Sequence, residues 1–157
     1  MLKVDGCVED AICGRDKFVG RWRVVKEEGL DDIYSSLCVG RSRRQRFLLR
    51  LGLYSPHSLQ TVTCSDGEIT LANHAMGFTF TQKLVEGSFQ RSVLGHVSKH
   101  TTWWEDESIF VELIHGPCDA NPVVMHRWVD THGLFHVVAT HKRGGDTAVH
   151  ARVFARA

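Results

Sequence analysis

Residues 18–40, FVGRWRVVKEEGLDDIYSSLCVG, decide the fold that this sequence predicts. The segment begins with a short strand rich in aromatic and β-branched side chains, which Gly29 interrupts. Asp31 and Asp32 follow, where the first turn of a helix favours acidic side chains. Apolar side chains then recur at helical spacing as far as Gly40, which is suited to end a helix. We therefore expect a strand that runs directly into a helix.

A second helix is predicted for residues 42–53, and Pro56 closes that region. Everything after Pro56 alternates between apolar and polar side chains in short runs. Turn signals such as Ser65-Asp66-Gly67 separate these runs. About ten short strands joined by tight turns favour an antiparallel meander that closes into a barrel, wide enough to enclose a ligand.

Length and composition are those of one globular domain. The chain has 157 residues, 24% of them charged, and a formal net charge of +1, so no bulk attraction to nucleic acid or membrane is expected. Five scattered cysteines without a CxxC pair fit a reducing compartment such as the cytosol. Residues 1–16 are mixed acidic and apolar rather than like a secretory signal. We expect an N-terminal extension of residues 1–16 followed by a barrel domain of residues 17–157.

Two arginines are predicted to face the inside of this barrel. In VVMHRWVD, Arg127 shares a strand face with Met125 and with flanking valines. In the closing strand, Arg152 shares its face with His150 and Phe154. A charge on an inward face requires an anion, because a buried unpaired charge is unfavourable. That anion is either a carboxylate ligand or an acidic side chain of an internal salt bridge; the alternative is that the arginines lie on the surface.

The whole layout resembles the intracellular fatty-acid-binding proteins. The similarity is carried by FVGRWRVV, LDDIYSSLCVG, SDGEIT, VVMHRWV, LFHVVATHKRG and ARVFARA, and it covers residues 17–157. It implies an all-β fold, a ten-stranded antiparallel up-and-down barrel capped by a helix–turn–helix lid. It also implies a monomeric carrier, not an enzyme, that holds a long-chain fatty acid non-covalently. The lipocalins also begin a barrel with a GxW strand, here Gly20-Arg21-Trp22, but they are usually secreted and lack the two-helix lid.

The resemblance assigns roles to particular residues. Many family members hold the carboxylate with two arginines and with the tyrosine of an Arg-x-Tyr pair. By position, the arginines are Arg127 and Arg152, and the tyrosine is replaced here by Phe154. The hydroxyl donor is therefore missing, and His150 on the same face is the candidate to replace it.

The ligand tail requires apolar lining and an entrance. We expect Met125, Phe78 and Phe80 to line the cavity. The portal residues are expected on the second helix and just after the third strand, namely Phe47, Leu48, Leu51 and Met76. For each of these, ordinary core packing is the alternative interpretation.

The one dense basic cluster is RSRRQRFLLR, residues 41–50. A helix with basic and apolar side chains favours transient contact with anionic membranes, each charge contributing about 1 kcal/mol near the surface. Such a cluster also fits a nuclear import surface, in which case the protein would be found in the nucleus as well as the cytoplasm. The remaining alternative is a helix face that is simply exposed to solvent.

Metal and enzyme chemistry find little support. Histidine pairs such as His96 and His100 lie four residues apart on a strand, about 13 Å, too far to share one ion. HExxH, GxSxG and phosphate-binding loops are absent from the sequence. We expect no catalytic residue, metal or cofactor.

Two other functions remain open. One is a retinoid or other hydrophobic-ligand carrier of the same fold. Retinol binders of this type usually carry glutamine at the arginine positions, which argues against retinol, whereas retinoic acid binders keep the arginines. The other is an interaction module whose cavity is vestigial.

Overall fold

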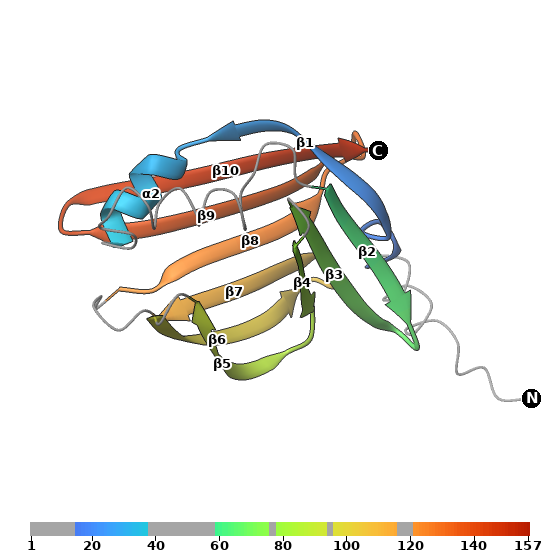
Figure 1. Cartoon of the computed structure of the whole chain (residues 1–157), viewed down its shortest axis with the longest axis horizontal. Coiled ribbons are helices and arrows are strands. Elements are labelled where there is room, and N and C mark those ends of the chain that lie inside the picture. Colours follow the sequence, from blue (N-terminus) through green and yellow to red (C-terminus); the bar gives the residue numbers. More distant parts are fainter. Residues whose placement is uncertain (1–14, 38–58, 76–77, 94–95, 116–120) are drawn as a thin grey trace, which may run out of the picture.

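The computed structural model describes residues 15–37, 59–75, 78–93, 96–115 and 121–157 (Figure 1). They form a helix and a curled ten-stranded sheet. In chain order the elements are β1 (Gly20–Glu28), α2 (Leu30–Leu37), β2 (Leu59–Ser65), β3 (Glu68–Ala75), β4 (Phe78–Lys83), β5 (Gly87–Val93), β6 (His96–Glu105), β7 (Ile109–His115), β8 (Val123–Val129), β9 (Phe135–Arg143) and β10 (Asp146–Arg156).

The strands form the antiparallel up-and-down meander that the sequence predicts. Their order in the sheet is β4-β3-β2-β1-β10-β9-β8-β7-β6-β5, so the first and last strands are neighbours. The sheet edges are β4 and β5, and among the described strands no ladder joins these two. The connection between β4 and β5 is held against β6, since Thr102 donates to the carbonyl of Val85 at 2.6 Å and the Trp104 indole donates to the carbonyl of Leu84 at 3.1 Å.

Two turns explain why the chain follows this path. Asp66 and Gly67 both have positive φ, 52° and 77°, which is the conformation of a tight hairpin turn between β2 and β3. Gly29, with φ of 77°, connects β1 to α2. A Cβ atom on Gly29 would lie 1.8 Å from the carbonyl oxygen of Val149 on β10. The glycine that interrupts the first strand is therefore required both for its backbone conformation and for the close approach of two strands.

One end of the barrel is filled by aromatic side chains. Phe18, just before β1, and Trp22 on β1 pack with rings from β6, β7, β9 and β10. The Trp22 indole donates to the carbonyl of Phe18 at 2.7 Å, which satisfies its buried N–H. Ring centroids in this cluster lie 5.0–5.5 Å apart, mostly in edge or tilted contacts, for the residues Phe18, Trp22, Trp104, Phe110, Phe135 and Phe154.

The helix lies at the other end. α2 contacts β9 and β10, near the hairpin that joins them (Figure 1). Its buried face carries Leu30 and Ile33. The second predicted helix, residues 42–53, lies outside the described residues. Within the described ranges, no helix is long and apolar enough to cross a bilayer.

Candidate functional site

Both predicted arginines face the inside of the barrel at the same level. Arg127 on β8 is 7% exposed and Arg152 on β10 is 2% exposed. Each is paired in register with Val137, which lies on β9 between them. Their backbones are therefore two strand spacings apart, about 10 Å. The sheet thus places two buried guanidinium groups side by side, directly above the aromatic end of the barrel.

Arg127 is bound by an inward carboxylate that the sequence analysis did not assign. Its Nη1 and Nη2 atoms donate to Glu112 Oε1 at 3.3 and 3.4 Å. The other carboxylate oxygen accepts from Gln82 at 2.9 Å and lies 3.2 Å from Nδ1 of His100. Gln82 lies on β4, so this network spans the opening between the sheet edges. The internal salt bridge considered from the sequence is present at Arg127.

Glu112 is ionised in this environment. Burial alone would raise its pKa, since the side chain is only 2% exposed. The nearby charge of Arg127 and the contact with His100 outweigh burial and lower the pKa from 4.5 to about 2. The carboxylate therefore neutralises Arg127 at any physiological pH.

Arg152 has a carboxylate partner of its own, Glu27 on β1. Arg152 Nε lies 3.2 Å from Glu27 Oε2, and the two residues are paired in register between β1 and β10. A β-bulge between Val24 and Lys26 turns Glu27 inward, because simple alternation from Trp22 would place it outside.

His150 lies next to this second pair. Its Nε2 is 3.6 Å from Glu27 Oε2, and the ring is buried. Burial and the nearby charge of Arg152 lower the His150 pKa from 6.5 to about 4. At neutral pH His150 is therefore an uncharged imidazole, able to donate through one ring nitrogen only.

Phe154 forms an apolar floor beneath Arg152. The ring is fully buried, and the Arg152 Cζ atom lies 4.8 Å from its centroid. Phe135 packs beside it at 5.4 Å. The guanidinium therefore makes a cation–π contact with this ring.

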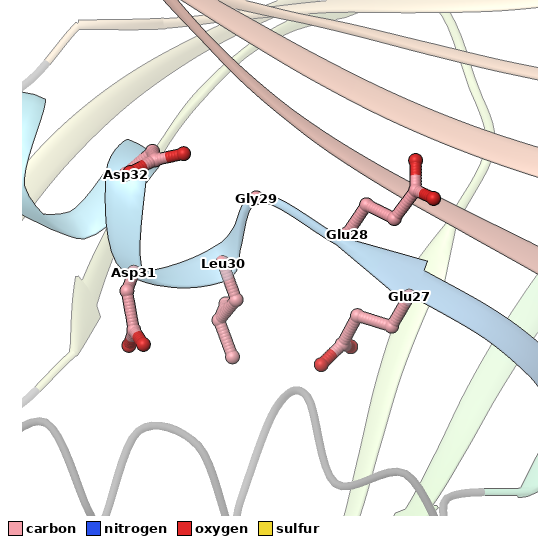
Figure 2. A pocket seen from close by; sticks show the side chains of 6 residues that line it. All are labelled: Glu27, Glu28, Gly29, Leu30, Asp31 and Asp32. Atoms are coloured by element: carbon pink, nitrogen blue, oxygen red, sulfur yellow. The ribbon is translucent and has the colours of Figure 1, made fainter.

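A pocket of about 340 Å³ opens where β1 passes into α2 (Figure 2). Its walls include Gly29, Leu30 and four acidic residues, Glu27, Glu28, Asp31 and Asp32. Glu27 and Glu28 leave β1 on opposite sides (Figure 2), as alternation along a strand requires. Within the described part of the chain, no group of histidine, cysteine or acidic side chains is arranged to hold a metal ion.

The remaining predicted residues fall into three groups. Met125 is buried on the inner face of β8, two residues from Arg127. Phe78 and Phe80 belong to β4, but their side chains lie outside the described structure. The four predicted portal residues lie outside the described residues, namely Phe47, Leu48, Leu51 and Met76. The basic segment 41–50 lies outside them as well.

The two inward glutamates are the residues of the candidate site that sequence reasoning missed. Glu112 had a detectable signal, because it is the single charge in the apolar run IFVELIH and shares a face with Phe110 and Ile114. Glu27 had none, because the bulge that turns it inward has no marker in VVKEEG.

The fold is similar to that of several solved lipid-binding proteins. A Schistosoma mansoni fatty acid binding protein, solved in complex with arachidonic acid, matches with a TM-score of 0.67 at 20% identity over 92% of this chain and 98% of that one. Echinococcus granulosus fatty-acid-binding protein 1 matches with a TM-score of 0.65 at 18% identity, over 90% and 98%. Apo lipid binding protein 8 of Caenorhabditis elegans matches with a TM-score of 0.66 at 12% identity, over 90% and 96%. The chain has the fold of the fatty-acid-binding proteins. No family model and no curated protein sequence matches it, so the likeness is one of structure.

Relative to the pattern expected of the fatty-acid-binding proteins, the interior carries both arginines but lacks the tyrosine hydroxyl. It also contains two carboxylates, Glu27 and Glu112, that balance the arginine charges.

Proposed function

We propose that this protein binds and carries long-chain fatty acids inside the barrel, with the carboxylate at Arg127 and Arg152. The observation that supports this proposal is the pair of buried arginines that lie side by side on the inner wall, one on each side of Val137, at one level of the barrel. Burial of the acyl chain would provide most of the affinity, at about 0.8 kcal/mol per methylene. The arginines would set the orientation of the ligand and the preference for an acid.

The head group has to share the arginines with the glutamates. A guanidinium has five N–H donors in a planar fork, so it can bind a ligand carboxylate and a protein carboxylate together. The incoming acid nevertheless adds one negative charge to an interior in which Glu27 and Glu112 already balance the arginines. We therefore propose a carrier in which the head group contributes orientation more than affinity.

The cellular role follows from the same proposal. We place the protein in the cytoplasm, and in the nucleus if the basic segment 41–50 acts in import. We further propose that this segment makes the transient membrane contacts through which ligand is exchanged, and that the carrier works as a monomer without catalysis.

The charge balance favours one second candidate, a carrier of neutral lipids or of retinoids. Two unpaired arginines would exclude an uncharged ligand, because its head group would leave them uncompensated. Here Arg127 and Arg152 each have a glutamate, so a neutral head group would leave no charge uncompensated. The retained arginines therefore no longer argue against retinol.

Competition binding tests both candidates. Delipidated protein is loaded with a fluorescent fatty acid probe, and oleate, retinoic acid and retinol are titrated against it. Paired replacements remove each arginine together with its glutamate, so that no buried charge is left alone: Arg127→Gln with Glu112→Gln, and Arg152→Gln with Glu27→Gln.

We expect oleate to displace the probe and to lose about tenfold or more in affinity in each paired variant, the value of a hydrogen bond to a charged group. Arg23→Gln, an exposed position on β1, is the matched control and should bind like the wild type. Displacement by retinol alone, unaffected by the paired variants, would establish the neutral-lipid function instead. If the probe does not bind, the carrier function itself is wrong.

A further inference from the structure

Apart from the arginine–glutamate pairs, another polar contact lies on the inner wall, at the helix end of the barrel. Ser36 on α2 has its hydroxyl within hydrogen-bonding distance of Nδ1 of His141 on β9. Arg143 donates to the carbonyl of Ser36 at 3.4 Å and helps to hold the helix over this strand. His141 is 1% exposed and continues the inward series of β9 that includes Val137 and Ala139.

The far nitrogen of this ring is unusual. Nε2 of His141 is covered from solvent and has no hydrogen-bond partner anywhere in the described part of the molecule. Buried polar atoms without partners are rare, because each one loses its hydration without compensation. The contact of Nδ1 with Ser36 fixes the ring, so Nε2 is a pre-positioned polar atom on the inner wall.

The chemistry of this atom selects the kind of group it can bind. A serine hydroxyl can donate to Nδ1, which leaves a proton on Nε2, or accept from it, which leaves Nε2 as an acceptor. A ligand hydroxyl fits both cases, because it also donates or accepts. A plain acyl chain satisfies neither.

The position of this atom relative to the arginines sets a distance. His141 lies four residues along β9 from Val137, the residue opposite Arg127 and Arg152, which corresponds to about 13 Å. An extended acyl chain advances roughly 1.25 Å per carbon, given C–C bonds of about 1.5 Å, so this span is about ten carbons. Between these two levels the inner wall carries Ala139 and Met125, with the buried imidazole of His150 beside Ala139 on β10.

We propose that the cavity is built for fatty acids with a mid-chain hydroxyl, whose carboxylate lies at the arginines and whose hydroxyl binds Nε2 of His141. This inference rests on the proposed fatty acid function and specifies its ligand. Ser36 acts as the positioning residue, because it fixes the ring and does not contact the ligand.

Positional isomers of one chain test the inference. Stearate, 2-hydroxystearate, 10-hydroxystearate and 12-hydroxystearate are each titrated against the fluorescent probe. We expect the 10- and 12-hydroxy acids to bind about three- to tenfold more tightly than stearate, the value of one neutral hydrogen bond. The 2-hydroxy acid, whose hydroxyl lies next to the carboxylate, should show no such gain.

Variants then locate the effect. His141→Phe should bind stearate like the wild type and lose the mid-chain preference, and Ser36→Ala should reduce that preference by releasing the ring. His132→Phe, in the exposed turn before β9, is the control and should keep it. Folding of each variant is checked by its unfolding transition. If His141→Phe does not fold, the loss of the mid-chain preference is tested with Ser36→Ala instead.

The failures are distinguishable. Stearate binding with no mid-chain preference, or a preference that survives in both variants, overturns this inference and leaves the carrier function standing. Failure of every acid to displace the probe overturns the carrier function as well.

Discussion

Replacing Glu112 by glutamine should destabilise the ligand-free protein and strengthen carboxylate binding together. The substitution keeps the size of the side chain but removes the charge that balances Arg127. The fall in the Glu112 pKa from 4.5 to about 2 means that the folded protein favours the ionised form by about 3 kcal/mol more than the unfolded chain does. Loss of one partner of a buried ion pair typically costs about 3–5 kcal/mol, which agrees.

Thermal and urea unfolding of delipidated protein measure this loss. For a chain of this size, about 3 kcal/mol lowers the melting temperature by about 6–12 °C. The control is Glu28→Gln, because Glu28 forms an exposed pair with Lys26 at 3.0 Å. Exposed pairs contribute at most about 1 kcal/mol, so this control should unfold close to the wild type.

Binding provides the second half of the prediction. In Glu112→Gln, an oleate carboxylate would become the partner of Arg127, so oleate affinity should rise about tenfold or more while retinol affinity stays the same. Oleate should also restore much of the lost melting temperature. A variant that is as stable as the wild type, with unchanged oleate affinity, would refute the conclusion that Glu112 neutralises Arg127.

Three further outcomes follow from single positions. Gly29→Ala should lower the free energy of unfolding by more than about 2 kcal/mol in urea, because Gly29 has a left-handed backbone and a Cβ atom there would meet the carbonyl of Val149. The control is Gly67→Ala, since Gly67 has the same φ but open space around it. This control should lower the free energy of unfolding by only about 1–2 kcal/mol. The free energy of unfolding should decrease as pH falls from about 6.5 to about 4, because His150 takes up a proton in the unfolded chain but not in the folded protein. In His150→Gln this decrease should be smaller by about 3 kcal/mol, measured by urea unfolding across that pH range. Phe154→Tyr should tighten oleate binding about tenfold in the displacement assay, and unchanged or weaker binding would show that the head group is held elsewhere.

Local patterns were sufficient for much of the fold. The strand-to-helix junction at Gly29 and the hairpin turn at Asp66 and Gly67 depend on a few neighbouring residues, and the structure places both where the sequence predicts them. The inward direction of Arg127 and Arg152 also follows from local alternation, because side chains two apart on a strand share a face. The direction of a strand side chain is therefore readable from the sequence wherever the strand is regular.

The partners of these arginines were decided only in three dimensions. Glu112 meets Arg127 because β7 pairs with β8 in one particular register, and Gln82 joins them across the open edge of the sheet. Glu27 reaches Arg152 because the first strand pairs with the last and a bulge shifts its faces by one residue. Charge balance in the interior depends on register and on a bulge, which act between strands. The sequence by itself determines which side chains a strand turns inward only where that strand is regular.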